Sequence, residues 1–509
     1  MSQEKALEPC CGRLGRREFL SDLGMGFSGL ALGSLLFRDG LAPASAKATA
    51  GRRDDEHAAW RPPDGKPHFR PKAKSVIWIF MKGGVSHLES FDPKQALNTH
   101  AGKSIAETPF KTFLESKFLK NVRSIRGDGD KRHIKLTLYP MQVGFSRYGA
   151  SGIEIADWWP EIGSCADDIA FVRSVWTSDN KHFAQLQYHT GRHSNEGAFP
   201  TIGSWVHYGL GSLNENLPQF VVLGPSIEPC CGGDNAHGAD YLGPLHAGVR
   251  LNVDPDKPLP FSTPGKALFW EEQKAEFDLL GRLNRIAGVE YPDDPMIRAR
   301  IRSYELAFRM QSVMPQIMRV EQESRETKAL YGLDRKETRE FGQICLAARK
   351  LVERGVRFVQ VFHGGTTNED SWDSHWSLKK NLARLSTQVD RPIGGLLKDL
   401  KQRGLLEDTL VVWATEFGRT PGRQSEAMDG RDHNPMASCA WMAGGGVKGG
   451  IVHGATDEIG FHAVENRHYV TDIHATVLHQ LGLDPRKLEV PGRKRLDVDF
   501  GKPIREIIA

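Results

Sequence analysis

Four polar segments of the sequence combine imidazole with carboxylate side chains, which together suit divalent metal ions such as zinc and manganese. Each segment directly follows an apolar run. The residues of interest are His87, Glu89 and Asp92; then Asp179, Asn180, His182, His189 and His193; then His363, Glu369, Asp370, Asp373 and His375; and finally Glu416, Arg419, Asp432 and His433. No local motif such as HExxH is present, so a metal site would have to be assembled from distant segments.

Individual residue types in these segments suggest roles. Asp373 and His375 lie two positions apart, so in an extended loop both side chains can reach one ion. Glu416 directly follows an apolar run, which fixes its backbone. Arg419 offers a planar fork that suits a phosphate or sulfate group, and we expect it on the rim of the site. His182 is the expected general acid or base. The alternative is that these are ordinary solvated loop residues.

His433 belongs to the short segment "GRDHNP", where Asp432 precedes it and Asn434 and Pro435 follow. We interpret this segment as a polar turn. Two interpretations remain open at this point, namely a turn on the surface and a turn that places the His433 imidazole in the site.

The elements that must position these residues are alternating strands and helices. Apolar runs predict strands within "SVIWIFMKGG", "IAFVRSVW", "QFVVLG", "VRFVQVFHGG", "TLVVWATEFG" and "SCAWMAGGG". Helical patterns cover 341–355 and 391–404, and a charged helical insertion is expected at about 267–340. This alternation predicts an α/β fold with a mainly parallel central sheet flanked by helices. Because ligands bind beyond the carboxyl ends of such strands, we expect Glu416, Asp373 and His433 at that edge.

The N-terminal segment has the features of an export signal. Arg16-Arg17 is followed by Phe19-Leu20, a short apolar run and the small-residue sequence Ala44-Ser45-Ala46. These features predict a twin-arginine signal peptide over 1–46 and a periplasmic or secreted protein. We expect a polar linker at 47–73 and one domain at 74–509. No later run is long and apolar enough to predict a membrane span.

Charge and cysteine content exclude other classes of protein. The formal net charge is only +4, and no basic run with interleaved aromatic residues suggests a nucleic acid partner. Five scattered cysteines remain after the signal, and an odd number without paired spacing does not predict a disulfide framework. The sequence leaves the oligomeric state open.

Several motifs together resemble a known family. The chain closely resembles the exported proteins of domain-of-unknown-function family 1501, which is grouped with the alkaline phosphatase-like and sulfatase superfamily. The resemblance runs through "GGVSHLESFDPK", "QLQYHTG", "WDSHWSLKKN", "TEFGRTP", "GRDHNP" and "VTDIHATVLHQLGLD". It implies an alkaline phosphatase-like fold and a metal site.

The resemblance also assigns residues to that site. It places Asp373 and His375 on one metal ion and His433 as a further ligand. Glu416 stands where the superfamily has the aspartate of an Asp-His pair, and Phe417 stands in place of the histidine. Half of a two-metal site is therefore retained in the sequence pattern.

The other half of that site is altered. Lys82 stands where a metal-binding aspartate is expected, and Lys181, beside His182, stands at the nucleophile position. His87, with Glu89 and Asp92, is the candidate to rebuild the lost half.

Two functions follow as hypotheses. The first is an exported hydrolase of phosphate or sulfate esters that depends on a divalent ion, with zinc, calcium and manganese all open. Since no Ser, Thr or Cys stands at the nucleophile position, direct attack by water is the expected route. The second is a non-catalytic envelope protein that binds a sulfated glycan or a protein partner on the same fold.

Overall fold

The computed structural model describes residues 63–118, 137–258, 270–290, 295–365, 367 and 370–509. The predicted signal at 1–46, most of the predicted linker, and Glu369 lie outside these residues. The chain divides into two compact units. Of the described residues, those within 264–309 belong to one, and those within 61–263 and 310–509 belong to the other. Among the described residues, no helix combines the length and the apolar character needed to cross a membrane.

Within the smaller unit, helices occupy the region expected to be a helical insertion. Helix α7 spans Trp270–Glu290 and helix α8 spans Pro295–Met318, the latter running into the larger unit. The Phe277 and Phe308 rings stack between the two helices with their centroids 4.2 Å apart. A short helix, α9 at Arg325–Leu330, follows in the larger unit.

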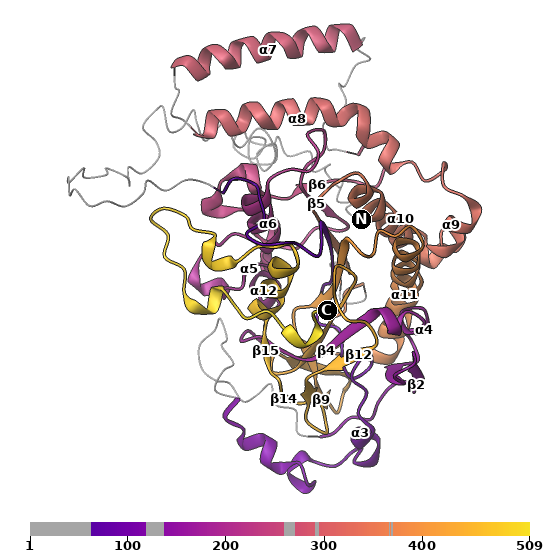
Figure 1. Cartoon of the computed structure of the whole chain (residues 1–509). Coiled ribbons are helices and arrows are strands. Elements are labelled where there is room, and N and C mark those ends of the chain that lie inside the picture. Colours follow the sequence, from indigo (N-terminus) through magenta and orange to yellow (C-terminus); the bar gives the residue numbers. More distant parts are fainter. Residues whose placement is uncertain (1–62, 119–136, 259–269, 291–294, 366, 368–369) are drawn as a thin grey trace, which may run out of the picture. The chain divides into compact units, whose positions relative to one another are not determined.

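The larger unit is built on a mainly parallel sheet, as predicted (Figure 1). Strand β1 (Ser75–Met81) lies between β7 (Phe358–His363) and β8 (Thr409–Thr415) and is parallel to both. Beyond β7, the sheet continues in parallel with β5 (Phe220–Leu223) and β6 (Val249–Arg250). These strands form because continuous apolar runs are buried on both faces of a parallel sheet.

On the other side of β8 the sheet contains one reversed strand. Strand β11 (Ser438–Ala443) runs antiparallel to β8 and to β4 (Ile169–Trp176). The outer edge of β4 pairs in parallel with β12 (Ile451–His453) and β15 (His468–Tyr469). The amino end of β11 therefore lies at the same edge as the carboxyl ends of β1, β4, β7 and β8.

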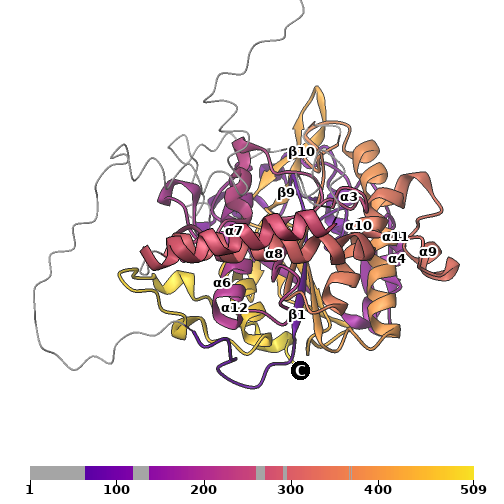
Figure 2. The same cartoon turned by 90° about the horizontal axis from the view of Figure 1, so that it is seen from above.

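Helices cover both faces of the sheet, which confirms the predicted α/β class (Figures 1 and 2). On one face, α5 (Ala184–Thr190), α6 (Ile202–Leu210) and α12 (Val470–Gln480) pack on Val76, Trp78 and Phe80 of β1, among other strand residues. The other face carries α10 (Lys336–Glu353) and α11 (Leu378–Gln402). The remaining short elements are α3 (Gln95–Thr99), α4 (Pro160–Gly163), β2 (Phe145–Tyr148), β3 (Ile153–Ala156), β13 (Ala455–Thr456) and β14 (Ala463–Glu465).

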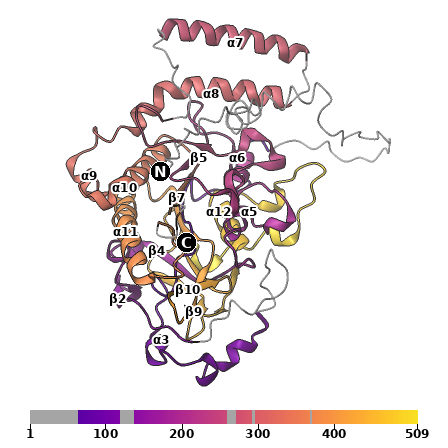
Figure 3. The same cartoon turned by 180° about the vertical axis from the view of Figure 1, so that it is seen from behind.

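A β-hairpin replaces the polar turn expected around His433. Strand β9 (Gly418–Ser425) pairs antiparallel with β10 (Met428–Asn434), and Figure 3 shows the two side by side. His433 is opposite Arg419 in the register. The prediction of a turn was wrong because the segment is held by polar tertiary contacts, which an apolar pattern does not reveal. The hairpin leads from the end of β8 to the start of β11.

The described thiols agree with the absence of a disulfide framework. Cys165, Cys345 and Cys439 are buried and unbridged. Burial raises the pKa of Cys165 to about 11, so this thiol stays protonated at neutral pH.

Candidate metal centre

Six of the seven residues proposed for the site come together at one edge of the sheet, and His87 is the exception. His182 lies in the loop between β4 and α5, Asp373 and His375 in the loop between β7 and α11, and His433 near the end of β10. Glu416 directly follows β8, whose strand register fixes its backbone. The fold thus gathers side chains from four segments that are far apart in the sequence.

The Asp373 carboxylate is the centre of this cluster. Its Oδ1 atom lies 3.0 Å from His433 Nε2, 3.0 Å from His375 Nε2 and 2.7 Å from Arg419 Nη2. Burial disfavours the ionised carboxylate, but the Arg419 charge and the hydrogen bond from His182 outweigh it and hold the Asp373 pKa well below its usual range. Asp373 is therefore an anion throughout the ordinary pH range.

His182 lies between two carboxylates. Its Nε2 atom is 3.1 Å from Asp373 Oδ2, and its Nδ1 atom is 3.1 Å from Glu416 Oε1. Burial lowers the His182 pKa, but the hydrogen bonds to Asp373 and Glu416 raise it to about 9. His182 therefore contacts the ligand cluster directly.

The His433 ring turns a lone pair towards the Asp373 carboxylate. Its Nδ1 atom is 2.8 Å from the carbonyl oxygen of Asn180, which can only accept, so Nδ1 carries the proton. Burial, then the Arg419 charge, lowers the His433 pKa to about 3, so the ring is neutral at neutral pH. Its Nε2 lone pair therefore faces Asp373 Oδ1, 3.0 Å away. Two acceptor atoms at this distance repel unless a proton or a cation lies between them.

His375 completes this convergence of acceptor atoms. Its Nε2 atom lies 3.1 Å from His433 Nε2, and its Nδ1 atom lies 3.0 Å from Gln424 Oε1. Within the described part of the chain, two groups of three residues have ligand atoms within 4.8 Å of one another, namely His182, Asp373 and His433, and His375, Asp432 and His433. The residues present thus fit a divalent ion, because imidazole nitrogens and carboxylate oxygens meet at one point.

Glu416 reaches the cluster through His182. The Glu416 side chain is fully buried, and its Oε1 atom also accepts the Gly83 N–H at 2.8 Å and a Gln185 amide N–H at 3.3 Å. Its Oε2 atom lies 3.2 Å from the Thr415 hydroxyl. With these partners, Glu416 is placed to orient His182.

Arg419 is not on the rim of the site, and that expectation is corrected. Its side chain is fully buried, with Nε donating to the Gly84 carbonyl at 2.7 Å and Nη1 donating to the Arg431 carbonyl at 3.1 Å. Nη2 donates to the Gly83 carbonyl and to Asp373. Gly83 and Gly84 have φ of +120° and +84°, a backbone conformation that favours glycine. The donor groups of the guanidinium are thus engaged by backbone carbonyls and by Asp373, so Arg419 cannot hold a substrate anion at the rim.

His87 is also placed away from the role expected for it. It is buried, its Nε2 atom lies 2.8 Å from the Gly460 carbonyl oxygen, and its Nδ1 atom accepts the Arg419 backbone N–H at 3.4 Å. Burial is the main cause that lowers the His87 pKa. Both ring nitrogens are engaged, so His87 ties two loops together and offers no free ligand atom.

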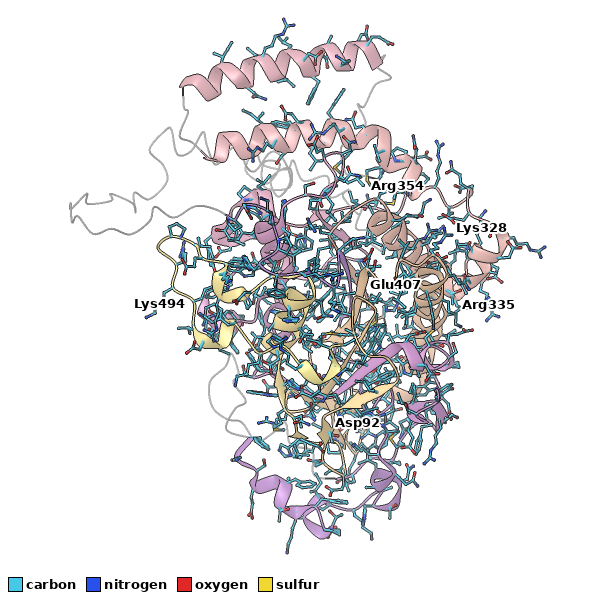
Figure 4. The ribbon with its side chains drawn as sticks, viewed as in Figure 1. Asp92, Lys328, Arg335, Arg354, Glu407 and Lys494 are labelled. Atoms are coloured by element: carbon cyan, nitrogen blue, oxygen red, sulfur yellow. The ribbon has the colours of Figure 1, made fainter. Side chains whose placement is uncertain are left out.

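The two carboxylates that follow His87, those of Glu89 and Asp92, form ion pairs with basic side chains outside the metal cluster. Glu89 forms a fully buried ion pair with Arg431, with Oε1 2.8 Å from Nη2. Asp92, labelled in Figure 4, lies 3.0 Å from Lys94 Nζ and accepts a hydrogen bond from Thr456. The suggestion that these residues rebuild the second half of a two-metal site was therefore wrong.

The other histidines of the polar segments are distributed through the fold. His189 packs in the core against Phe80, with ring centroids 4.5 Å apart. His193 lies 3.3 Å from Asp179, and His363 contacts Gln388. Imidazole content alone thus predicted more ligands than the geometry provides.

Sequence reasoning missed the contributions of Asn180 and Gln424. Asn180 acts through its backbone carbonyl, which its side chain does not reveal. Gln424 lies in the hairpin, whose polar pattern was not interpreted as strands. The two lysines at altered positions differ from each other. Lys181 is exposed, whereas Lys82 is buried with Nζ 2.6 Å from the Ser226 carbonyl, and burial lowers the Lys82 pKa to about 8.

The fold and the cluster together define an α/β protein with a candidate metal centre at the carboxyl edge of its sheet. The family model described as "Protein of unknown function (DUF1501)" matches residues 73–508, so the chain belongs to this family, as predicted. No curated protein matches its sequence.

Several solved structures are similar to the chain over most of its length. A phosphonate monoester hydrolase from Silicibacter pomeroyi shares 14% identity, covering 68% of this chain and 71% of that one, with a TM-score of 0.34. A protein in the alkaline phosphatase superfamily from Vibrio parahaemolyticus shares 10% identity, covering 87% and 72%, with a TM-score of 0.32. A sulfatase from Pseudoalteromonas sp. shares 13% identity, covering 69% and 66%, with a TM-score of 0.32.

Proposed function

We propose that the protein is a hydrolase of phosphate or sulfate esters that depends on a divalent metal ion. The observation that carries the proposal is the neutral His433 ring, whose Nε2 lone pair faces the Asp373 carboxylate oxygen at 3.0 Å. His375 Nε2 joins the same point. A cation at this point turns the repulsion of these acceptor atoms into attraction.

The donor set indicates which ion the cluster takes. Asp373, His375 and His433 would hold it, with Asp432 in reach. A site rich in imidazole nitrogen suits zinc or manganese, whereas calcium prefers an all-oxygen environment. Of the metals left open by the sequence, we therefore favour zinc and manganese. When bound, such an ion polarises an ester oxygen and makes a water molecule more acidic.

The residues around the ion would donate a proton to the leaving group and contact the anionic group of the substrate. His182, with its pKa raised to about 9, carries a proton at neutral pH, and its Nε2 atom can donate that proton to a leaving oxygen. Glu416 keeps the ring in place through Nδ1. The donors of Arg419 are already bound to backbone carbonyls and Asp373. The exposed Lys181 beside His182 is therefore our candidate to contact the anionic group of the substrate.

We also propose that this activity is exerted outside the cytoplasm. The support is the pair Arg16-Arg17, followed by a short apolar run and Ala44-Ser45-Ala46. The substrate would then be a phosphate or sulfate ester of the periplasm or of the surroundings, with a sulfated glycan as one candidate.

A second candidate function is that of a non-catalytic envelope protein that binds a sulfated glycan or a protein partner. The observation that favours it is the pair of lysines at positions where the resemblance implies a metal-binding aspartate and a nucleophile. Lys82 directs its ammonium group to a backbone carbonyl, which is a structural role.

Metal analysis of the purified exported protein, followed by a screen of phosphate and sulfate esters with the metal found, tests the first proposal. We expect about one equivalent of zinc or manganese at this cluster, so His375→Ala and His433→Ala should each bind about one equivalent less than the wild type with the fold retained. His100→Ala, at a histidine outside the cluster, is the matched control. Full metal retention in both cluster variants would refute the metal centre. A stoichiometric ion without turnover of any ester would favour the binding protein.

A further inference from the structure

We propose a second divalent-metal site, formed by His453 and His468 with Glu506 and oriented by Asp472. This site is independent of the proposed ester hydrolase, because it shares none of that cluster's residues. It would bind a borderline ion such as zinc through two imidazoles and a carboxylate.

The sheet brings the two histidines together from separate strands. His453 ends β12 and His468 begins β15, and both strands pair with the same edge of β4. His453 is opposite Val172 in that register and His468 is opposite Val175. Their backbones are therefore fixed by the same strand, and the two rings lean towards each other with their centroids 5.1 Å apart.

The two ring nitrogens are at a spacing that a metal ion can bridge. The Nε2 atoms of His453 and His468 lie 2.9 Å apart. Two zinc–nitrogen bonds of about 2.0–2.1 Å at a tetrahedral angle place the nitrogens about 3.3 Å apart. A movement of roughly 0.4 Å, the difference between these spacings, converts the pair into two ligands of one ion.

The orientation of His468 favours metal binding. Its Nδ1 atom lies 3.0 Å from Asp472 Oδ2, while Asp472 Oδ1 accepts the Lys502 N–H at 2.8 Å. An ionised carboxylate only accepts, so the His468 Nδ1 carries the proton and its Nε2 presents a lone pair to His453. A carboxylate that holds the far nitrogen of a ligand histidine is the usual support of protein zinc sites.

His453 and Glu506 supply the remaining ligands. His453 adds the second imidazole, and the pairing of β12 with β4 fixes its backbone beside His468. Glu506 Oε2 lies 4.0 Å from His453 Nε2, and its side chain is 63% exposed and so can rotate. Glu506 belongs to a short 3₁₀ helix, Arg505–Ile507, near the end of the chain. An ion would thus fasten this C-terminal segment to the edge of the sheet.

Metal titration of a protein lacking the first cluster tests the inference. In the full chain with His375→Ala and His433→Ala, we expect one equivalent of Zn²⁺ or Co²⁺ to bind, with a Co²⁺ absorption band of nitrogen and oxygen ligands. His468→Ala in that background should lose the ion, and Asp472→Asn should weaken its binding about 10–100-fold. His100→Ala, at a histidine outside both clusters, is the matched control and should bind normally.

Two outcomes would overturn the inference: no ion bound in the background that lacks the first cluster, or an ion retained in His468→Ala. Circular dichroism checks the fold, and His453→Gln serves as a second variant if His468→Ala is unfolded. Hydrogen exchange adds a readout at the C-terminal segment, since the ion should protect the amides of 505–507 in the parent and not in Glu506→Gln. Equal protection in both would exclude Glu506 as a ligand and refute the proposed three-residue site. The first metal centre is tested separately by the metal content of the His375→Ala protein, in which His453 and His468 are intact.

Discussion

The Nη2 atom of Arg419 lies 2.7 Å from Oδ1 of Asp373, so one buried ion pair joins hairpin β9–β10 to the loop that follows β7. The guanidinium also donates to the Gly84 and Arg431 carbonyls. It therefore satisfies backbone groups of two segments as well as the charge of the central carboxylate. Breaking this arrangement should affect folding and the metal centre together.

The first prediction is that Arg419→Lys destabilises the protein by roughly 3 kcal/mol, as expected when a buried pair loses its geometry. A lysine cannot donate in the several fixed directions of the guanidinium fork. Urea unfolding measures the change, and Arg423→Lys in the same strand is the control, with a change below about 1 kcal/mol. An Arg419→Lys protein of unchanged stability that has lost only ester turnover would restore the role of Arg419 in substrate binding.

A second prediction concerns the fully buried pair Glu89 and Arg431, 2.8 Å apart. Glu89→Gln leaves the guanidinium charge uncompensated in the interior and should cost about 3–5 kcal/mol, and Arg431→Met should cost a similar amount. The double variant should cost less than the sum of the two, because no charge is then left buried alone. Thermal or urea unfolding of the four proteins gives this coupling. Additive losses would show that the two side chains do not interact.

A third prediction concerns stability and pH. Asp390 accepts the backbone N–H groups of Glu161 and Ile162, and burial, the largest cause, raises its pKa to about 7. A buried carboxyl with a raised pKa stabilises the fold while it is protonated. Its contribution is therefore present below the unfolded pKa of about 3.9 and is lost as the pH rises through about 7.

The Asp390→Asn variant removes that titration. Its stability relative to the wild type should thus increase between about pH 4 and about pH 8, as measured by melting temperature across this range. Asp408→Asn, at an exposed carboxylate paired with Lys74, is the control and should show a smaller pH-dependent difference. A constant difference between wild type and Asp390→Asn at all pH values would contradict the raised pKa.

A fourth prediction tests export. Replacing Arg16 and Arg17 together with lysine should leave the precursor in the cytoplasm, because the twin-arginine translocase reads this pair. Cell fractionation followed by immunoblotting measures the distribution. The matched control replaces Arg52 and Arg53, an arginine pair beyond the expected cleavage site, and should be exported normally. Normal periplasmic amounts of the Arg16, Arg17 variant would refute the prediction of a twin-arginine signal.

The sequence predicted the sheet well because its strands are continuous apolar runs. β4 coincides with the run "IAFVRSVW", and β1, β7 and β8 lie within the predicted runs. Helix α11 was predicted only from 391, whereas it begins at Leu378 and continues through Pro392. Proline normally suggests a helix start, and here the packing of the apolar face overrides that local signal.

The convergence of the cluster was predictable in part. Strand ends indicated the edge at which Asp373, Glu416 and His433 lie, because parallel strands share their carboxyl edge. The burial of Arg419 was not predictable, since it depends on carbonyl groups that Gly83 and Gly84 expose in three dimensions. Residue type indicates what a side chain can bind, and only the fold shows which partner is already present.

Hairpin β9–β10 has a consequence for how the protein could vary. Its two strands meet the sheet beside Glu416 and His433, while Glu426 and Ala427 at its far end are exposed and lie outside both strands. Extra residues inserted between Glu426 and Ala427 would lengthen the tip without shifting the register that fixes the cluster. The tip is therefore where relatives can differ in length, and where a fluorescent tag or an epitope can be attached, without altering the chemistry at the base.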